Sequence, residues 1–206
     1  MWLRAERQTA GRGRQGRAWD SPIGNVYAST LVRLRAGDPP APSLALVAAV
    51  ALQQVASANG ANTARIKWPN DLLVGNAKVA GILLERAGDW VVIGCGVNLV
   101  HAPQVLGRAT AALSGFVHPI DAATFTRQLA DAMHEWIATW RRDGLAPVVG
   151  RWTACAHPAG TPLVARLPDG TQEEGAFDGL SPEGALNLRL ADGGVRVIHA
   201  GDVFLV

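Results

Sequence analysis

Apolar residues recur at helical spacing in two stretches of the chain, each bounded by residues that start or stop helices. After the proline-rich break at residues 38–42, we expect Ser43 to cap a helix that ends at Gly60. Asp121 is expected to cap a second helix, with Gly144 just after its end, and a short third helix should cover residues 147–152. The apolar positions of the two long helices are Leu44, Val47, Ala48, Ala51, Leu52, Val55, Phe125, Leu129, Met133, Trp136, Ile137 and Trp140.

Runs of β-branched and aromatic residues predict strands on both sides of the first helix. Gly75-Asn76, between two such runs, is typical of the turn of a β-hairpin. The expected strands cover residues 2–7, 25–34, 65–68, 72–74, 78–85 and 90–99.

The pattern changes near residues 156–160. Beyond this point, short strands follow one another with glycine-containing turns between them. They are expected at residues 163–167, 174–178, 185–190, 195–199 and 203–206. Five short strands in about 50 residues favour a small β-barrel.

Composition narrows the class of protein. The 206 residues are 49% hydrophobic and 17% charged, with a net charge of +2, so the chain is expected to fold and not to be a general binder of nucleic acid or membranes. Cys95 and Cys155 match no metal or redox spacing, which favours a reducing cytoplasm. The longest apolar run, residues 44–52, is expected to be too short to cross a bilayer, and charges interrupt the first seven residues as they would not in a signal peptide.

Lysine is scarce. Of the 19 basic residues only Lys67 and Lys78 are lysines, and they lie close together in the sequence. One interpretation is an arginine-favouring background with two lysines left over. The other is that both sites need a compact, mobile ammonium group, which a planar guanidinium cannot replace.

An arginine- and glycine-rich segment near the N-terminus is the first candidate for chemistry. Residues 11–16 match G-x-G-x-x-G, but the polar, proline-broken sequence that follows does not open the helix of a dinucleotide fold. Arg12, Arg14 and Arg17 could bind carboxylate or phosphate through their guanidinium groups, while the glycines allow close approach of a ligand. The alternative is a solvated basic loop.

Three further segments hold polar groups at strand ends. Residues 67–71 place a cation, an amide and a carboxylate just past a strand, where Asp71 could bind Mg²⁺ or could merely form an Asx turn. Lys78 begins an apolar strand whose small residues leave room for a ligand; alternatively, it only protects a hairpin edge. Residues 94–98 put two glycines and Asn98 at another strand end, which fits either ligand approach or close packing.

Together these four segments resemble the biotin protein ligase family in residue type, order and spacing. The matching stretches are residues 8–17 with Trp19, then 67–71, 78–83 and 94–98. The resemblance covers nearly the whole chain. It implies an α+β fold, in which a biotin- and ATP-binding catalytic domain at residues 1–155 has a mixed β-sheet with packed helices and is followed by an SH3-like β-barrel at residues 156–206.

The resemblance also implies a two-step reaction and a set of site residues. Biotin and ATP form biotinyl-5′-adenylate, and a lysine of a biotin carboxyl carrier protein then takes the biotinyl group. Arg14, Lys78 and Asp71 would be catalytic, with Asp71 holding Mg²⁺. The implied biotin-binding residues are Gln8, Gly11, Arg12, Gly13, Arg14, Lys78 and Gly81, and the implied ATP-binding residues are Arg14, Trp19, Lys67, Asn70, Asp71 and Asn98.

The pattern departs from the family before Gln8, where members usually carry a Ser/Thr-x-Asn motif that contacts the biotin head. An N-terminal DNA-binding domain is likewise missing, so no repressor role, nucleic acid or membrane partner is expected, and a homodimer is left open. Two alternatives remain. One is a lipoate or octanoate ligase, against which the Gly-Arg-Gly-Arg and Lys-Trp-Pro-Asn-Asp pair argues. The other is a non-catalytic module that binds RNA or a protein.

Overall fold

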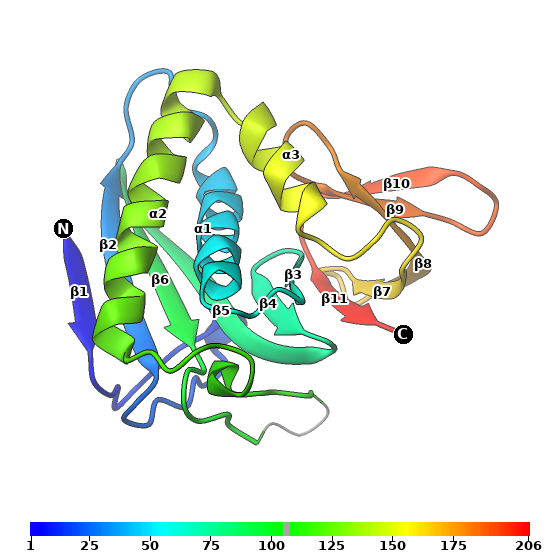
Figure 1. Cartoon of the computed structure of the whole chain (residues 1–206). Helices are drawn as coiled ribbons and strands as arrows, with labels where there is room; N and C mark the ends of the chain where they lie inside the picture. Colours follow the sequence, from blue (N-terminus) through cyan, green and yellow to red (C-terminus); the bar gives the residue numbers. More distant parts are fainter. Residues whose placement is uncertain (105–107) are drawn as a thin grey trace.

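The computed structural model describes residues 1–104 and 108–206. These residues form two antiparallel sheets and three α-helices, with the first sheet and its helices preceding the second sheet (Figure 1). The expected α+β class is therefore confirmed.

The first sheet has the strand order β1-β2-β6-β5-β4-β3. All of its strand pairings are antiparallel, and parallel contacts are confined to two isolated bridges, Ile66–Ala156 and Lys78–Thr110, so little of the expected mixed character is present among the described residues. Gly75, with a φ of 57°, forms the predicted hairpin turn. The strands are β1 Trp2–Ala5, β2 Val26–Arg33, β3 Ala64–Lys67, β4 Asp71–Val74, β5 Ala77–Ala87 and β6 Trp90–Val97.

Two long helices pack on this sheet (Figure 1). Helix α1 (Leu44–Ala58) contacts β3 to β6, and α2 (Ala122–Asp143) contacts β1 and β2. Asp121 caps α2 as predicted, because its side chain accepts a hydrogen bond from the Thr124 N–H at 2.8 Å. Ser43 precedes α1 but makes no side-chain cap; its hydroxyl donates to the Pro40 carbonyl and accepts from Trp140 Nε1 at 2.8 Å. The expected Ser43 cap is therefore wrong.

The segment Ala41–Ala58 is long and apolar enough to cross a membrane by length and composition. The expectation that the longest apolar run is too short for this was therefore wrong. The short turn at Ala41–Ser43 continues directly into α1, which lengthens the apolar stretch. Of this window, 67% is buried inside the protein. Its burial is that of a central core helix, which the same test of length and composition also selects.

The second sheet has the order β10-β9-β8-β7-β11 and agrees with the five predicted strands. Helix α3 (Ala146–Ala154) leads into it, and Trp152 packs near Phe177 with ring centroids 6.2 Å apart. No pairing of β10 with β11 is described, so the sheet is open at these two edges within the described residues. Its strands are β7 Pro162–Arg166, β8 Gln172–Leu180, β9 Leu186–Arg189, β10 Val195–Ile198 and β11 Asp202–Leu205.

Candidate functional site

A cavity of about 730 Å³ lies where the arginine-rich loop, the first sheet and β11 of the second sheet meet. Each of the four segments singled out in the sequence contributes to its wall. Of the predicted site residues, those lining it are Gln8, Arg12, Gly13, Arg14, Trp19, Lys67, Asn70, Asp71, Lys78, Gly81 and Asn98. Segments far apart in the sequence thus converge on one polar pocket.

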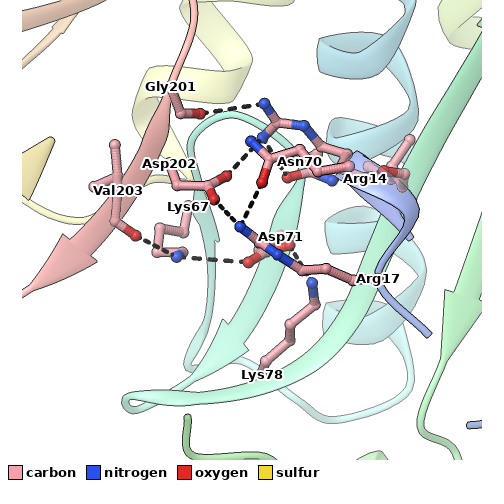
Figure 2. A network of polar contacts seen from close by, with 11 residues as sticks. Arg14, Arg17, Lys67, Asn70, Asp71, Lys78, Gly201, Asp202 and Val203 are labelled. Atoms are coloured by element: carbon pink, nitrogen blue, oxygen red, sulfur yellow. Dashed lines mark hydrogen bonds and ion pairs between the residues drawn. The ribbon is translucent and has the colours of Figure 1, made fainter. Parts of the chain in front are cut away.

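Both lysines of the chain pair with one buried carboxylate (Figure 2). Asp71, at the start of β4, is 5% exposed, accepts a hydrogen bond from Lys78 Nζ, and has its second oxygen 3.5 Å from Lys67 Nζ. Lys78 reaches it from β5, whose Gly81 lies opposite Asp71 in the antiparallel register. A buried carboxylate between two ammonium groups offsets part of their repulsion and fixes where their charges lie.

Lys67 also makes a hydrogen bond to the second sheet. Its Nζ donates to the Val203 carbonyl at 2.7 Å. Burial lowers the pKa of Lys67; Asp71 opposes this effect, while the charges of Arg108 and Lys78 add to it. Lys67 is therefore a partly desolvated ammonium group in a region of positive charge, a setting that favours an anionic ligand.

Two arginines of the N-terminal loop reach β11 (Figure 2). Arg14 Nη1 lies 3.3 Å from Asp202 Oδ1, and Arg14 Nη2 donates to the Gly201 carbonyl at 3.2 Å. Arg17 pairs with the other oxygen of Asp202. Burial would raise the pKa of Asp202, but Arg17 first, then Arg14 and Arg108, hold it below its usual value. Asp202 thus occupies guanidinium groups that could also bind a carboxylate or phosphate.

The loop carrying these arginines is a small hairpin. Trp19 N–H donates to the Gly11 carbonyl at 2.9 Å, and Gly13 N–H donates to the Arg17 carbonyl at 2.7 Å. Gly11 does not line the cavity: an added Cβ would lie 2.4 Å from the Trp19 carbonyl oxygen, so this glycine serves close packing. Its predicted biotin contact does not fit this position.

The floor of the cavity is made of glycines covered by an indole ring. A Cβ at Gly96 would come within 2.6 Å of Trp19 Cε2, and one at Gly81 within 3.1 Å of Trp19 Cζ3. Lys78 Nζ lies 5.3 Å from the centre of the Trp19 ring, within cation–π range. The buried Trp19 Nε1 has no hydrogen-bond partner among the described residues. Trp19 therefore rests on the strands themselves, where flat groups fit because side chains are absent.

The side-chain amides of Asn70 and Asn98, both predicted to bind ATP, donate hydrogen bonds to backbone carbonyls. Asn70 Nδ2 donates to the Ile82 carbonyl at 2.6 Å, and its Oδ1 lies 3.4 Å from Arg14 Nη1. Asn98 is 1% exposed, and its Nδ2 donates to the Lys78 carbonyl at 3.3 Å. Asn98 therefore supports Lys78 through Nδ2, while its buried Oδ1 has no hydrogen-bond partner among the described residues.

The cavity offers no activated thiol. Cys95 lines it, but burial raises the pKa of this thiol to about 12, so the nucleophilic thiolate is absent at neutral pH. His157, outside the cavity wall, has its pKa lowered by burial first and then by Lys67 and Arg65. The chemistry of this pocket rests on fixed cations.

The fit of Mg²⁺ to Asp71 is poor. Both carboxylate oxygens of Asp71 face ammonium groups, and residues 1–104 and 108–206 contain no group of three His, Cys, Asp or Glu side chains that could hold a metal. Hard cations need several oxygen ligands. The expectation that Asp71 is a metal ligand is not supported by this geometry, and we derive no step from the ion.

Sequence reasoning missed the contribution of the second sheet. Asp202 and the Val203 carbonyl engage Arg14, Arg17 and Lys67, and Arg108 also lines the cavity. Asp202 lies 188 positions from Arg14. The only sequence signal is an acidic residue at the start of a short apolar strand, which does not distinguish it from an ordinary strand end.

Two family profiles match separate parts of the chain. The profile of the biotin/lipoate A/B protein ligase family matches residues 4–98, and that of the biotin protein ligase C terminal domain matches residues 163–206. The chain is 41% identical to the biotin–[acetyl-CoA-carboxylase] ligase of Paracoccus denitrificans, over 98% of this chain and 89% of that protein. It is 33% identical to the corresponding ligase of Mycobacterium tuberculosis, over 98% and 77% of the two chains.

A solved structure supports the fold. The biotin protein ligase of Aquifex aeolicus, in complex with biotin and ATP, superposes with a TM-score of 0.89 and 22% identity, covering 100% of this chain and 89% of that one.

Proposed function

The chain belongs to the biotin protein ligase family, and from this premise we propose which of its residues carry each step of the reaction. It is an ATP-dependent ligase that activates biotin as biotinyl-5′-adenylate and transfers the biotinyl group to a lysine of a biotin carboxyl carrier protein. The observation that carries the assignment of roles is the convergence of Arg14, Lys67 and Lys78 on one cavity.

In the first step, a carboxylate oxygen of biotin attacks the α-phosphorus of ATP. A new P–O bond forms, the bond from the α-phosphorus to the bridging oxygen breaks, and pyrophosphate leaves with that oxygen. Two anions must approach each other, so fixed cations lower the barrier by stabilising charge on the phosphoryl oxygens. We assign this role to Lys78 and Arg14, with Asp71 holding the ammonium group of Lys78 in place.

In the second step, the amine of the carrier lysine attacks the acyl carbon of the mixed anhydride. The C–N bond forms, the C–O bond to AMP breaks, and the amine loses a proton. Water would compete for the same acyl carbon, so the adenylate has to be shielded. We propose that the 10–19 loop and Trp19 provide this cover, because their backbone bonds close a hairpin over the glycine floor.

The two sides of the cavity are proposed to divide between the substrates. Gln8, Arg12, Gly13 and Gly81 form the biotin side. Lys67 and Asn70 form the nucleotide side, where Lys67 is a partly desolvated cation. Gly11 and Asn98 act through packing and backbone support.

We further propose that β7 to β11 form an SH3-like barrel whose β10 and β11 edges stay unpaired, that the two domains divide between residues 155 and 156, and that the protein acts in the cytoplasm. The C-terminal profile match at residues 163–206 supports the first of these. Size-exclusion chromatography would test a homodimer.

The decisive experiment incubates the protein with biotin, ATP and Mg²⁺ and detects biotinyl-adenylate by mass spectrometry. Parallel reactions with lipoate and octanoate test the alternative ligase, and pyrophosphate release separates any ligase from a binding module. Because a ligand that binds only the folded state stabilises it, biotin with ATP should raise the melting temperature more than either alone. Adenylate formed from octanoate and not from biotin would reject the assignment.

A further inference from the structure

Asn25, which lines no part of the cavity, makes three hydrogen bonds to the segment that follows β6. It stands immediately before β2 and is 1% exposed. Its Oδ1 accepts from the N–H groups of Val100 and His101, each at 2.9 Å, and its Nδ2 donates to the His101 carbonyl at 2.8 Å. One buried amide thus holds three successive peptide groups of this corner.

The corner is shaped to receive this amide. Gly24, with a φ of 102°, lies beside Val100, whose Cβ would be 3.4 Å from an added Cβ. A side chain at position 24 would meet both backbone strain and Val100. Gly24 therefore lets the chain pass close to Val100, and Asn25 hydrogen-bonds the Val100–His101 corner.

From this corner a path of backbone links and hydrogen bonds leads to Lys78. Pro103, two residues beyond His101, accepts a hydrogen bond from Thr110 Oγ1 through its carbonyl. On either side of Thr110, the Ala109 carbonyl accepts from Lys78 N–H at 2.9 Å, and Ala111 N–H donates to the Lys78 carbonyl at 3.1 Å. The peptide groups of Lys78 are therefore held by the segment that Asn25 anchors.

The same segment forms part of the cavity wall. Pro103, Gln104, Arg108 and Thr110 all line it. The charge of Arg108 acts on Lys67 and Asp202, which places it on the side that we assign to the nucleotide. A shift of the Val100–His101 corner would displace this wall and loosen the Lys78 backbone together.

We infer that Asn25 is a positioning residue for adenylate formation: it sets the nucleotide-side wall and the backbone of Lys78 through the Val100–His101 corner. This inference rests on the proposed function. It predicts a selective defect, because the biotin-side residue Gln8 is held separately, by Ser21 Oγ at 2.8 Å.

The test compares Asn25→Ala, Asn25→Asp and Asn59→Ala with the parent protein. Asn59 is the control, because its side-chain amide also holds other groups, through two bonds from Nδ2 at 2.7 Å each to the Val55 carbonyl and Gln128 Oε1, outside the cavity wall. Asn25→Asp retains an oxygen that can accept from both N–H groups but loses the donor to the His101 carbonyl, so it is expected to fall between the parent and Asn25→Ala. Circular dichroism confirms that each variant is folded.

For Asn25→Ala we expect the KM for ATP to rise and the single-turnover rate of adenylate formation to fall, each by roughly tenfold, as loss of a few buried hydrogen bonds would produce. The KM for biotin should change less than about twofold, and Asn59→Ala should match the parent in both. Amide hydrogen exchange at Val100 and His101 should accelerate in Asn25→Ala and stay slow in Asn25→Asp.

The inference would be overturned if Asn25→Ala raised the KM for ATP and the KM for biotin equally, or if amide exchange at Val100 and His101 were unchanged in this variant. Asn25→Asp provides a second test of the inference. If adenylate formation in Asn25→Asp is as slow as in Asn25→Ala and exchange at Val100 and His101 is as fast, the accepting oxygen of Asn25 does not hold the corner. If the parent protein itself forms no biotinyl-adenylate, the proposed function fails. The exchange measurement still tests the anchoring of the corner in that case.

Discussion

Replacing Asp71 by asparagine tests how the two lysines are held. The substitution keeps the shape of the side chain and removes its charge. Lys78 Nζ and Lys67 Nζ, whose side chains are 11% and 13% exposed, then face a neutral amide. Lys67 retains its bond to the Val203 carbonyl. Two nearly buried ammonium groups are left without the carboxylate that compensated them.

The expected loss follows from the burial of the pair. Removing one partner of a buried ion pair costs about 3–5 kcal/mol because an uncompensated charge remains. The retained Val203 contact and the small residual exposure of Lys67 favour the low end, about 3 kcal/mol of unfolding free energy. For a chain of this size, such a loss lowers the melting temperature by roughly 6–12 °C.

The loss should depend on pH in a defined direction. Burial already lowers the pKa of Lys67, and removing Asp71 removes the largest influence opposing that shift. Between the lowered folded-state pKa and the unfolded-state pKa of about 10.5, the unfolded chain binds more protons than the folded one, so stability rises with pH. The deficit of Asp71→Asn is therefore full below the folded-state pKa of Lys67 and shrinks as the pH rises through it towards about 10.5.

Urea unfolding followed by circular dichroism, at about pH 7 and about pH 9.5, measures both effects. Asp178→Asn is the matched control, because its partner Arg189 is 52% exposed and such surface pairs contribute about 1 kcal/mol or less. If Asp71→Asn is no less stable than Asp178→Asn near neutral pH, or if its deficit grows with pH, the lysines are not held by Asp71 as described.

Three further outcomes are expected. Lys78→Arg should stay folded and slow single-turnover adenylate formation. Lys78→Ala should slow it by roughly 10²–10³, as expected for loss of a preorganised charge-stabilising donor. A Lys78→Arg variant as fast as the parent would contradict the catalytic role of Lys78. Gly96→Ala should displace the indole of Trp19, since the new Cβ would lie 2.6 Å from Cε2; the fluorescence change should vanish in a Trp19→Phe background, and no change would refute the contact. Asp202→Asn should make trypsin cleave after Arg14 several-fold faster, whereas an unchanged rate would show that Asp202 does not hold the loop.

Local patterns were enough to predict the elements, because helix and strand spacing are set by neighbours in sequence. The periodicity of α1 and the turn at Gly75 needed no distant contact to interpret. Ser43 shows the limit: its hydroxyl accepts from Trp140 Nε1, so tertiary contact replaced the expected cap. Whether the second sheet closes depends on an edge contact that alternation along a strand does not encode.

The candidate site was predictable only on the first sheet. Its segments carry paired polar types at strand ends, which sequence can identify. Asp202 instead pairs with Arg14 and Arg17 because the second sheet lies beside the N-terminal loop. The sequence of a four-residue strand does not indicate where that strand lies relative to the first sheet. The same limit explains Asn25: the sequence pattern predicted it as the first residue of a strand, and no local signal indicates that its amide binds the Val100–His101 corner.

The scarcity of lysine gains a physical interpretation from Asp71. An arginine-favouring background that happened to leave two lysines gives no reason for them to meet, yet both ammonium groups pair with the same buried carboxylate at the wall of the cavity. A guanidinium at either position would bring a larger planar group with a fixed fork of donors into a space shared by three charges. The convergence therefore favours the interpretation that these two positions require lysine. It also places the strongest constraint on the carboxylate between them, for which the family resemblance had implied a role in holding Mg²⁺.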